Sequence, residues 1–428
     1  MSPIPLGILA AAMGGGGYYA ATLTGSNRIR SIEITPDGDY LLAGYQDSGP
    51  LGGTDGFVVK MSPDGTILWQ KNIGNSSNNQ AVATVDTSGN IYVGVTYTGT
   101  NEQINLMKLD SNGTLVSQVN FNKVDTRPSE FINRMIWGKD NNLYVMGWGF
   151  SGNIYAPQSF ILKVNSSLSR VWGRQWNNNR DSFCGVLGAG IDPSGNVYCA
   201  VSNNYAVTAQ DPGLAKLNSS GTQQWHKVRY YSGTNDGISE NSFDAIIDNS
   251  NEPIHIHTGA YWTVGQAYNV RKLNSSGTEQ WVTAISNNEF NGGSIGALAV
   301  DANNDIYALV RRSSTFLVKL NTSGTVLWKR DILNFSGENL RVDLNGDVVV
   351  TGFAFGQPAI VKMAADGSTI GSAALPGGTI TLQISTQGAG VTSNAIKDGS
   401  AVTSVDPGTA AGSLTVQNLS KSVELAGF

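Results

Sequence analysis

The stretch Val-Lys-Met-Ser-Pro-Asp-Gly-Thr at 59–66, with Trp69 three residues beyond it, decides the fold because versions of it recur through the chain. Its lysine occurs seven times, at intervals of 48, 55, 53, 56, 47 and 43 residues. The seven are Lys60, Lys108, Lys163, Lys216, Lys272, Lys319 and Lys362. Self-similarity at this period predicts a repeat architecture, in which each unit buries its apolar face only against its neighbours.

Two further positions of the phrase are shared between units. A glycine lies five residues after the lysine in six of them: Gly65, Gly113, Gly221, Gly277, Gly324 and Gly367. A tryptophan lies nine residues after it in five: Trp69, Trp172, Trp225, Trp281 and Trp328. Glycine at a fixed place between apolar segments is typical of a tight turn.

Each unit contains four segments with the composition of strands. In the second unit they are 81–86, 91–96, 104–109 and 114–120, rich in Val, Ile, Tyr and Thr and separated by Gly, Asn, Asp and Ser. Four antiparallel strands in each of seven units predict an all-β fold, a seven-bladed β-propeller. A solenoid is the structural alternative. The propeller is favoured because the rungs of parallel β-solenoids are shorter than these units.

The two ends of the repeat predict how the ring closes. Residues 18–24 align with the fourth, outer strand of a unit whose first three strands are missing. In the last unit, Gly371 stands where the tryptophan is expected. We therefore expect residues 18–24 to complete the final blade of a propeller that spans 18–375. Residues 376–428 lack the repeat phrase and predict a small β appendage or a flexible arm.

Residues 1–17 form an apolar N-terminal segment with no basic residue before Arg28. It lacks the charged start of a secretory signal, and about a dozen apolar residues are too few to span a bilayer, so no membrane insertion is expected. Two interpretations remain open. The segment is either a disordered leader or a docking peptide that buries four side chains on another protein. Those side chains are Ile4, Leu6, Ile8 and Leu9.

The Lys-x-x-x-x-Gly-x-x-x-Trp phrase resembles two known propeller repeats. Its glycine and tryptophan look like the tryptophan-docking motif of quinoprotein-type propellers, in which the indole packs between blades. The stretches 53–60 and 85–93 are closer to the bacterial seven-bladed β-propeller repeat family, and this resemblance covers roughly residues 18–371. A narrower resemblance, at 4–17, is to the start of tailed-phage virion proteins, where such a segment is thought to fasten the protein to the particle.

Charge and cysteine content exclude some classes of function. The net charge of −5 gives no attraction to a phosphate backbone, so nucleic-acid binding is not expected. Cys184 and Cys199 flank a predicted turn but are six residues out of register, about 20 Å along a strand. A disulfide cannot bridge that distance, so we expect two free thiols.

Catalytic and metal-binding groups are sparse in the sequence. His255 and His257 would share one face of a strand, but a zinc site needs a third protein ligand that the sequence does not indicate. The stretches 301–305 and 343–347 resemble the opening of a calcium loop, yet they occupy a recurrent hairpin turn, whose chemistry explains them. We expect no metal, no cofactor and no enzymatic activity. The acidic residues available to a polysaccharide-degrading enzyme are Glu33, Asp244 and Asp343, and the sequence does not say whether they lie together.

The long connections between strands are expected on one face of the propeller and carry many aromatic residues. Aromatic platforms beside amide and hydroxyl groups suit sugar rings or a protein surface. The alternative is that each ring packs against neighbouring loops. The candidate binding residues are Tyr97, Trp148, Tyr155, Tyr205, Tyr261, Trp262 and Tyr268.

These observations lead to an expected function. We expect a non-enzymatic structural or binding component of a phage virion, associated with the tail, assembled in the host cytoplasm and present in several copies. Its expected partners are other virion proteins and a host-surface glycan or receptor. An exported or surface-bound bacterial propeller that binds carbohydrate or protein is the alternative, and a polysaccharide-degrading enzyme comes third.

Overall fold

The computed structural model describes residues 7–12, 18–24, 28–47, 53–74, 78–98, 104–121, 129–150, 157–177, 186–206, 209–228, 241–261, 265–285, 295–311, 315–384, 391–393, 403–404 and 415–418. Within these ranges the chain forms only strands and the turns between them. No helix long and apolar enough to cross a membrane occurs in this part of the chain.

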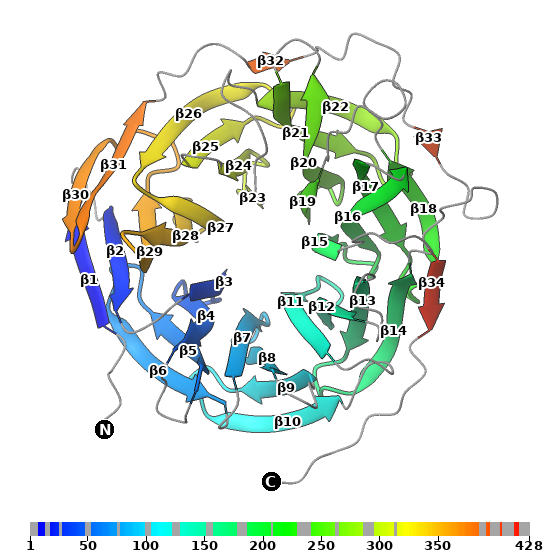
Figure 1. Ribbon diagram of the computed structural model, residues 1–428, viewed down its shortest axis with the longest axis horizontal. Helices are drawn as coiled ribbons and strands as arrows, with labels where there is room; N and C mark the ends of the chain where they lie inside the picture. The colour runs from blue at the N-terminus through cyan, green and yellow to red at the C-terminus, as the bar shows by residue number, and fades with distance from the viewer. Residues whose placement is uncertain are drawn as a thin grey trace.

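Seven antiparallel sheets stand around a central axis as the blades of a closed propeller (Figure 1). Each blade is a four-stranded meander with its first strand nearest the axis and its fourth at the rim. The prediction of an all-β, seven-bladed propeller is confirmed. The solenoid alternative is wrong, because the sheets close on themselves instead of stacking into a rod.

The strands of the seven blades have the following bounds. Blade 1 contains β3 (Arg28–Ile34), β4 (Tyr40–Gln46), β5 (Asp55–Met61) and β6 (Ile67–Ile73). Blade 2 contains β7 (Asn78–Val85), β8 (Ile91–Thr98), β9 (Ile104–Leu109) and β10 (Leu115–Phe121). Blade 3 contains β11 (Ser129–Trp137), β12 (Leu143–Phe150), β13 (Pro157–Val164) and β14 (Arg170–Asn177). Blade 4 contains β15 (Val186–Ile191), β16 (Val197–Ala206), β17 (Ala209–Leu217) and β18 (Gln223–Val228). Blade 5 contains β19 (Ser242–Ile247), β20 (Pro253–Tyr261), β21 (Gly265–Leu273) and β22 (Glu279–Ile285). Blade 6 contains β23 (Ile295–Val300), β24 (Ile306–Arg311), β25 (Thr315–Leu320) and β26 (Val326–Leu333). Blade 7 contains β27 (Ser336–Val342), β28 (Val348–Ala354), β29 (Gln357–Met363) and β2 (Tyr19–Thr24).

Blade 7 joins the two ends of the repeat. β2 pairs antiparallel with β29, with Tyr19 opposite Lys362 and Thr22 opposite Ala359. This is the pairing that the repeat alignment predicts for residues 18–24. β1 (Gly7–Ala12) adds a fifth strand outside β2. Part of the expected docking segment is therefore a strand of the propeller's own sheet, while Ile4 and Leu6 lie outside the described residues.

The middle strands of each blade form the core because neighbouring blades cover both of their faces. In blade 1 every residue of β5 is buried, whereas the rim strand β6 buries only Ile73. Phe57, Val58, Val59 and Met61 supply the apolar part of β5, and Asp55 and Lys60 are buried with them. Rim strands carry the polar side chains.

A direct contact between neighbouring blades explains the recurrent spacing of glycine and tryptophan. The indole N–H of Trp225 in blade 4 donates to the carbonyl of Ser275, in the turn between β21 and β22 of blade 5, at 3.2 Å. Gly277 in that turn has a φ of +83°, and a Cβ there would lie 3.1 Å from the indole. The same indole-to-carbonyl bond joins three other pairs of neighbouring blades, through Trp69, Trp172 and Trp281.

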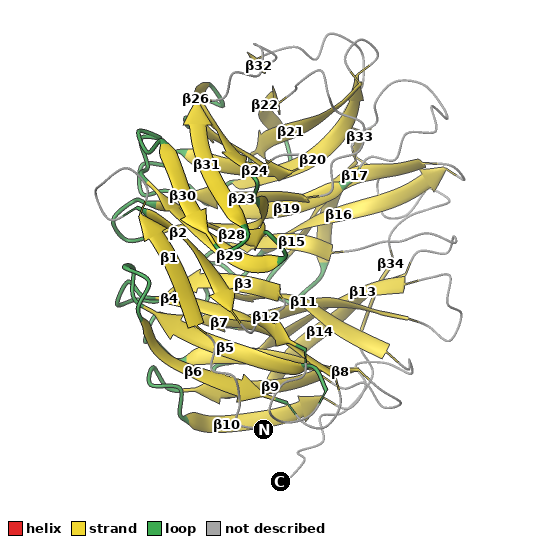
Figure 2. Ribbon diagram, turned by 60° about the vertical axis from the view of Figure 1, so that its left-hand side comes forward, coloured by secondary structure: helices red, strands yellow, loops and turns green. Residues whose placement is uncertain are grey.

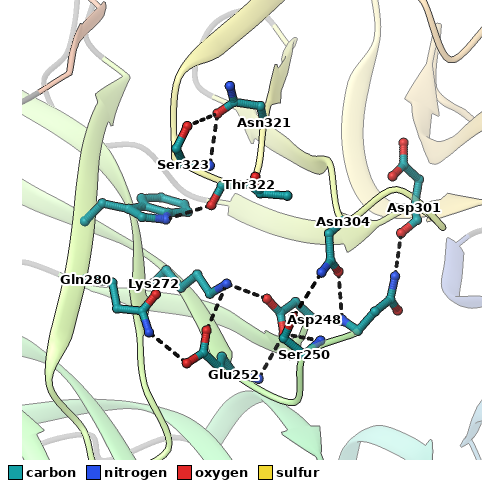
Figure 3. A network of polar contacts seen from close by, with 12 residues as sticks. Asp248, Ser250, Glu252, Lys272, Gln280, Asp301, Asn304, Asn321, Thr322 and Ser323 are labelled. Carbon is teal, nitrogen blue, oxygen red and sulfur yellow. Dashed lines mark hydrogen bonds and ion pairs between the residues drawn. The ribbon is translucent and has the colours of Figure 1, made fainter.

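In five of the seven blades the lysine of the repeat phrase neutralises carboxylates in the first turn of its own blade. Figure 3 shows this in blade 5, where Lys272 lies 2.7 Å from Asp248 and 3.0 Å from Glu252. Asp248 also accepts the backbone N–H groups of Ser250 and Glu252 and so closes the turn. The lysine and the aspartate are therefore one structural unit. Lys108 and Lys216 instead donate to the carbonyls of Ser166 and Ser275 in the next blade. The turns between the first and second strands of the blades lie together on one face of the ring (Figure 2).

The segment after blade 7 runs back along the rim of the ring. β30 (Gly371–Leu375) and β31 (Gly378–Ile384) form a hairpin, and β31 pairs with β26 of blade 6. The next three strands pair with the rim strands of blades 5, 4 and 3. They are β32 (Val391–Ser393), β33 (Thr403–Ser404) and β34 (Thr415–Asn418). The described part of 376–428 thus extends existing blades instead of forming a sheet of its own, and the expected boundary at 375 falls inside the hairpin.

Leu23 in β2 provides a test of ring closure. The side chain is 0% exposed, so Leu23→Ala should lower the free energy of unfolding by about 2–5 kcal/mol through lost apolar contact and a cavity. Leu68→Ala on β6 is the matched control, because Leu68 is 49% exposed and should change stability by less than about 0.5 kcal/mol. Denaturant unfolding measures both. Equal effects of the two variants would contradict the closure.

The contact between tryptophan and glycine can be tested by adding one methyl group. Gly277→Ala should lower stability through the positive φ, about 1–2 kcal/mol, and also through a clash with the Trp225 indole. Gly356→Ala isolates the first effect, since Gly356 has a φ of +76° with nothing within 4 Å of the added Cβ. Thermal or urea unfolding should therefore rank Gly277→Ala as the less stable variant. The reverse order would show that the indole does not rest on this turn.

Candidate functional site

The innermost strands of the blades surround a cavity on the propeller axis. Its volume is about 390 Å³, and residues of β3, β11, β15, β19, β23 and β27 line it. A second cavity of about 660 Å³ lies toward the face of the tight turns, where Pro36 and Thr87 line it. Glu33, Arg134 and Arg341 line both cavities, so they form the waist between them.

A β-bulge recurs at one place in five of the seven innermost strands. In β3 the pairing with β4 skips one residue, Arg30, between Ile29 and Ser31. The corresponding skipped residues in β11, β15, β19 and β27 are Asn133, Leu187, Phe243 and Glu338. All five line the 390 Å³ cavity. A bulge inserts one unpaired residue and redirects its side chain, so the repeated bulge gives this cavity a lining that differs from blade to blade.

Ion pairs fix the charged side chains around the axis. Arg341 binds Glu33 through two parallel hydrogen bonds of 2.6 and 3.0 Å. Glu338 lies 2.9 Å from Arg28 and 3.5 Å from Arg311. These contacts link β3 of blade 1 to β27 of blade 7 at the same level as the bulges.

Asp244 lines the 390 Å³ cavity beside the waist. It pairs with Arg134 and accepts the backbone N–H groups of Ala245 at 2.9 Å and of Leu298 at 3.1 Å. Gly188 makes room for this arrangement, because a Cβ there would lie 2.1 Å from the Asp244 carboxylate. Asp244 is therefore held by three blades.

We call the two cavities together the axial channel. The side chains that line its 390 Å³ part carry a net positive charge, whereas the whole chain is negatively charged. Four arginines and three carboxylates line the 390 Å³ cavity, an excess of one positive charge in a protein of net charge −5. Arg311, outside this lining, lies 3.5 Å from Glu338 and adds a second positive charge. Burial alone would lower the pKa of the Arg341 guanidinium, but the carboxylates of Glu33 and Asp244 outweigh it and raise that pKa. For Arg30, burial and then the charge of Arg28 lower the pKa. The site therefore favours an added negative charge near Arg28 and Arg30.

The candidate acids of the sequence analysis separate into two places. Glu33 lies at the waist between the two cavities, and Asp244 lines the 390 Å³ cavity beside it. Asp343 lies in the first turn of blade 7, where it accepts the backbone N–H groups of Asn345 and Asp347 and contacts Lys362. Asp301 closes the equivalent turn of blade 6 in the same way. The carboxylates of the two calcium-like stretches are thus engaged in hairpin turns.

The aromatic residues expected to bind a ligand have different positions. Tyr155 and Trp262 lie outside the described residues. Tyr97, Tyr205 and Tyr261 belong to β8, β16 and β20, of which the structure gives the backbone at these positions.

The structure describes the side chains of the two remaining aromatic candidates. Trp148 is half-buried and stacks on Phe131, with ring centroids 4.6 Å apart. Tyr268 is fully buried, and its hydroxyl donates to the carbonyl of Arg311 at 2.8 Å. The ring of Tyr268 belongs to the core between blades 5 and 6.

The histidine pair is buried and engaged. His255 and His257 stack with centroids 4.9 Å apart. Nδ1 of His255 accepts from Arg271 at 3.0 Å, so the neutral ring carries its proton on Nε2, which lies 3.0 Å from the Ser242 hydroxyl. Both nitrogens are then occupied by protein groups. The residues that the structure describes contain no group of three or more metal-ligating side chains.

Cysteine chemistry is confined to the interior as far as the structure describes it. Cys199 is a free, fully buried thiol, and burial raises its pKa. Cys184 lies outside the described residues.

Comparison with solved structures finds propellers. One described as the Dos1 propeller shares 10% sequence identity, with a TM-score of 0.50, over 83% of this chain and 88% of that chain. A glucose dehydrogenase shares 10% identity, with a TM-score of 0.43, over 66% of this chain and 95% of that chain. A protein of unknown function from Bacteroides caccae shares 12% identity, with a TM-score of 0.33, over 76% of this chain and 94% of that chain.

No family model and no curated protein matches the sequence. At 10% identity the likeness to the Dos1 propeller shows the fold alone. The class of the protein is thus a seven-bladed β-propeller with a charged axial channel. The likenesses to quinoprotein propellers and to phage virion proteins rest on the sequence phrases that carry them.

His226 should make stability depend on pH. Burial, and then the nearby charge of Arg271, lower the pKa of His226 from 6.5 to about 4. Between these values the unfolded chain binds the proton and the folded protein does not, so the free energy of unfolding falls as the pH falls from 6.5 to 4. The contribution of one histidine is at most about 1.4 kcal/mol per pH unit. The His226→Gln variant should lose this part of the pH dependence of the free energy of unfolding, as measured by denaturant unfolding at several pH values. Identical pH dependence in the variant and the wild type would contradict the assignment.

Proposed function

We propose that this protein is a non-enzymatic structural and binding component of a phage virion, associated with the tail. In this proposal the ring is a rigid scaffold, and its N-terminal segment attaches it to other virion proteins. One face of the propeller contacts a host-surface glycan or receptor. The protein is assembled in the host cytoplasm and carried in several copies per particle.

The observation that carries the non-catalytic part is the engagement of the candidate catalytic acids in fixed contacts. Arg341 holds Glu33 through both carboxylate oxygens, and Asp244 is held by Arg134 and two backbone N–H groups. A general acid or base must exchange a proton with its substrate. Carboxylates held in this way are suited to orienting arginines, which is the requirement of a binding site.

The virion part of the proposal rests on the likeness of residues 4–17 to the start of tailed-phage virion proteins. β1 occupies residues 7–12 and pairs with β2, so a truncation before residue 7 leaves the described ring intact. This separates attachment from folding. Ile4 and Leu6 fall in the removable part.

Deletion of residues 1–6 should abolish incorporation into particles without changing the thermal unfolding midpoint. Mass spectrometry of purified virions, with and without the deletion, measures incorporation. A control deletion of 1–16 removes β1 as well and should also lower the unfolding midpoint, because it uncovers β2. A protein found in host cytoplasm but never in purified virions would contradict the proposal. Normal incorporation of the 1–6 deletion would contradict the docking role.

The alternatives give different results. An exported or surface-bound bacterial propeller would appear in the cell envelope fraction. A polysaccharide-degrading enzyme would release reducing ends from host capsule at a rate that Glu33→Gln abolishes. Under the proposal neither signal is expected.

A further inference from the structure

We propose that the bulged end of the axial channel binds a carboxylate-bearing sugar, with its acid group on Arg28 and Arg30 and its hydroxyls on the neighbouring carboxylates. This inference deepens the binding part of the proposed function and rests on it, but it does not depend on a virion location. It assigns both a site and a chemical class of ligand.

The positions of Arg28 and Arg30 suit the binding of the ligand's carboxylate. Arg30 is a bulge residue of β3, and its guanidinium reaches across blade 2 to Gln80 and to the carbonyl of Ile132, at 3.3 Å, in blade 3. These contacts hold its charge beside the cavity. The Arg28 side chain is 45% exposed and pairs with Glu338 alone among the described carboxylates, through Nε at 3.2 Å and Nη2 at 2.9 Å. A guanidinium presents five N–H donors, so this bidentate pair leaves the two N–H groups of Nη1 and one of Nη2 for a ligand carboxylate.

The carboxylates beside the arginines support a hydroxylated ligand. Glu338 is a second bulge residue and lies next to Arg28, only 9% exposed. An ionised carboxylate accepts about four hydrogen bonds, and its arginine partners do not use them all. Sugar hydroxyls are donors that fit these oxygens. A simple anion would leave them without a donor.

Phe243 supplies the apolar surface that a sugar ring requires. It is the bulge residue of β19, it lines the cavity, and its ring is held by Tyr268 with centroids 5.4 Å apart. One aromatic face beside polar groups is typical of sites for sugar rings. The cavity volume of about 390 Å³ lies within the range of small-molecule sites.

The charge balance favours a monoanion over a phosphate. The four arginines that line the cavity already face three carboxylates, and Arg311 adds one further positive charge beside Glu338. A dianionic phosphate would meet stronger repulsion from Glu33, Asp244 and Glu338 than a single carboxylate would, since Coulomb repulsion scales with charge. It would also offer few hydroxyl donors to them.

Isothermal titration calorimetry of the full chain tests the site with glucuronate and galacturonate, and with glucose and inorganic phosphate as the neutral and simple-anion probes. We expect saturable binding of at least one uronate, no binding of glucose, and weaker affinity as salt screens the charges. No saturable uronate binding up to about 10 mM would overturn the assignment. Phosphate binding as tight as that of the uronate would also overturn it, as it would reveal a general anion site.

Variants locate the site. Arg28→Ala should weaken uronate binding by about tenfold or more. Arg28→Lys keeps the positive charge but loses the parallel N–H donors of the guanidinium, so it should weaken binding less. Lys71→Ala is the control, because Lys71 is an exposed cation on the rim strand β6. Arg28 is 45% exposed and its partner Glu338 keeps Arg311 at 3.5 Å, so the thermal unfolding midpoint should fall only slightly. Equal affinity of Arg28→Ala and wild type would overturn the proposal. Virion mass spectrometry is a separate readout, so the two proposals can fail independently.

Discussion

The packing of one blade's indole on the next blade's glycine turn is the contact on which the rest of the structure depends. A blade cannot bury its own middle strands, because their side chains project from both faces of the sheet. The indole packs on the turn of the neighbouring blade, and its N–H donates to a carbonyl of that turn. Only glycine gives that turn both a positive φ and room for the ring. Four pairs of neighbouring blades share this contact.

Closure of the ring then creates the channel. Seven innermost strands face one axis, so a side chain in one blade meets partners from blades that are distant in sequence (Figure 1). Arg341 and Glu33 are an example, since 308 residues separate them in the chain. The bulges add variation to this symmetric frame. They place an arginine, an asparagine, a leucine, a phenylalanine and a glutamate at equivalent positions, which the uniform outer parts of the blades do not do.

The architecture follows from the sequence because its contacts repeat. The lysine, glycine and tryptophan have the same role in most of the blades, so their spacing predicts the blade number and the place of residues 18–24. The channel does not follow, because a bulge is one extra residue in a short alternating strand and leaves no periodic signal in the sequence. The pattern of aromatic residues also does not separate core from surface. Tyr268 follows a polar, aromatic stretch typical of a loop, but its ring is buried. The rim strands β32, β33 and β34 are too short for periodicity to indicate them.

Hydrogen–deuterium exchange of the intact protein tests the central claim, which is that residues 19–24 close the ring on β29. Paired amides in one cooperative unit exchange with the same free energy of opening. The account predicts that the amides of 19–22 and 359–362 are protected together, at the free energy of global unfolding. Rapid exchange of 19–22 while 359–362 remains protected would contradict it, because the ring would then be open at blade 7.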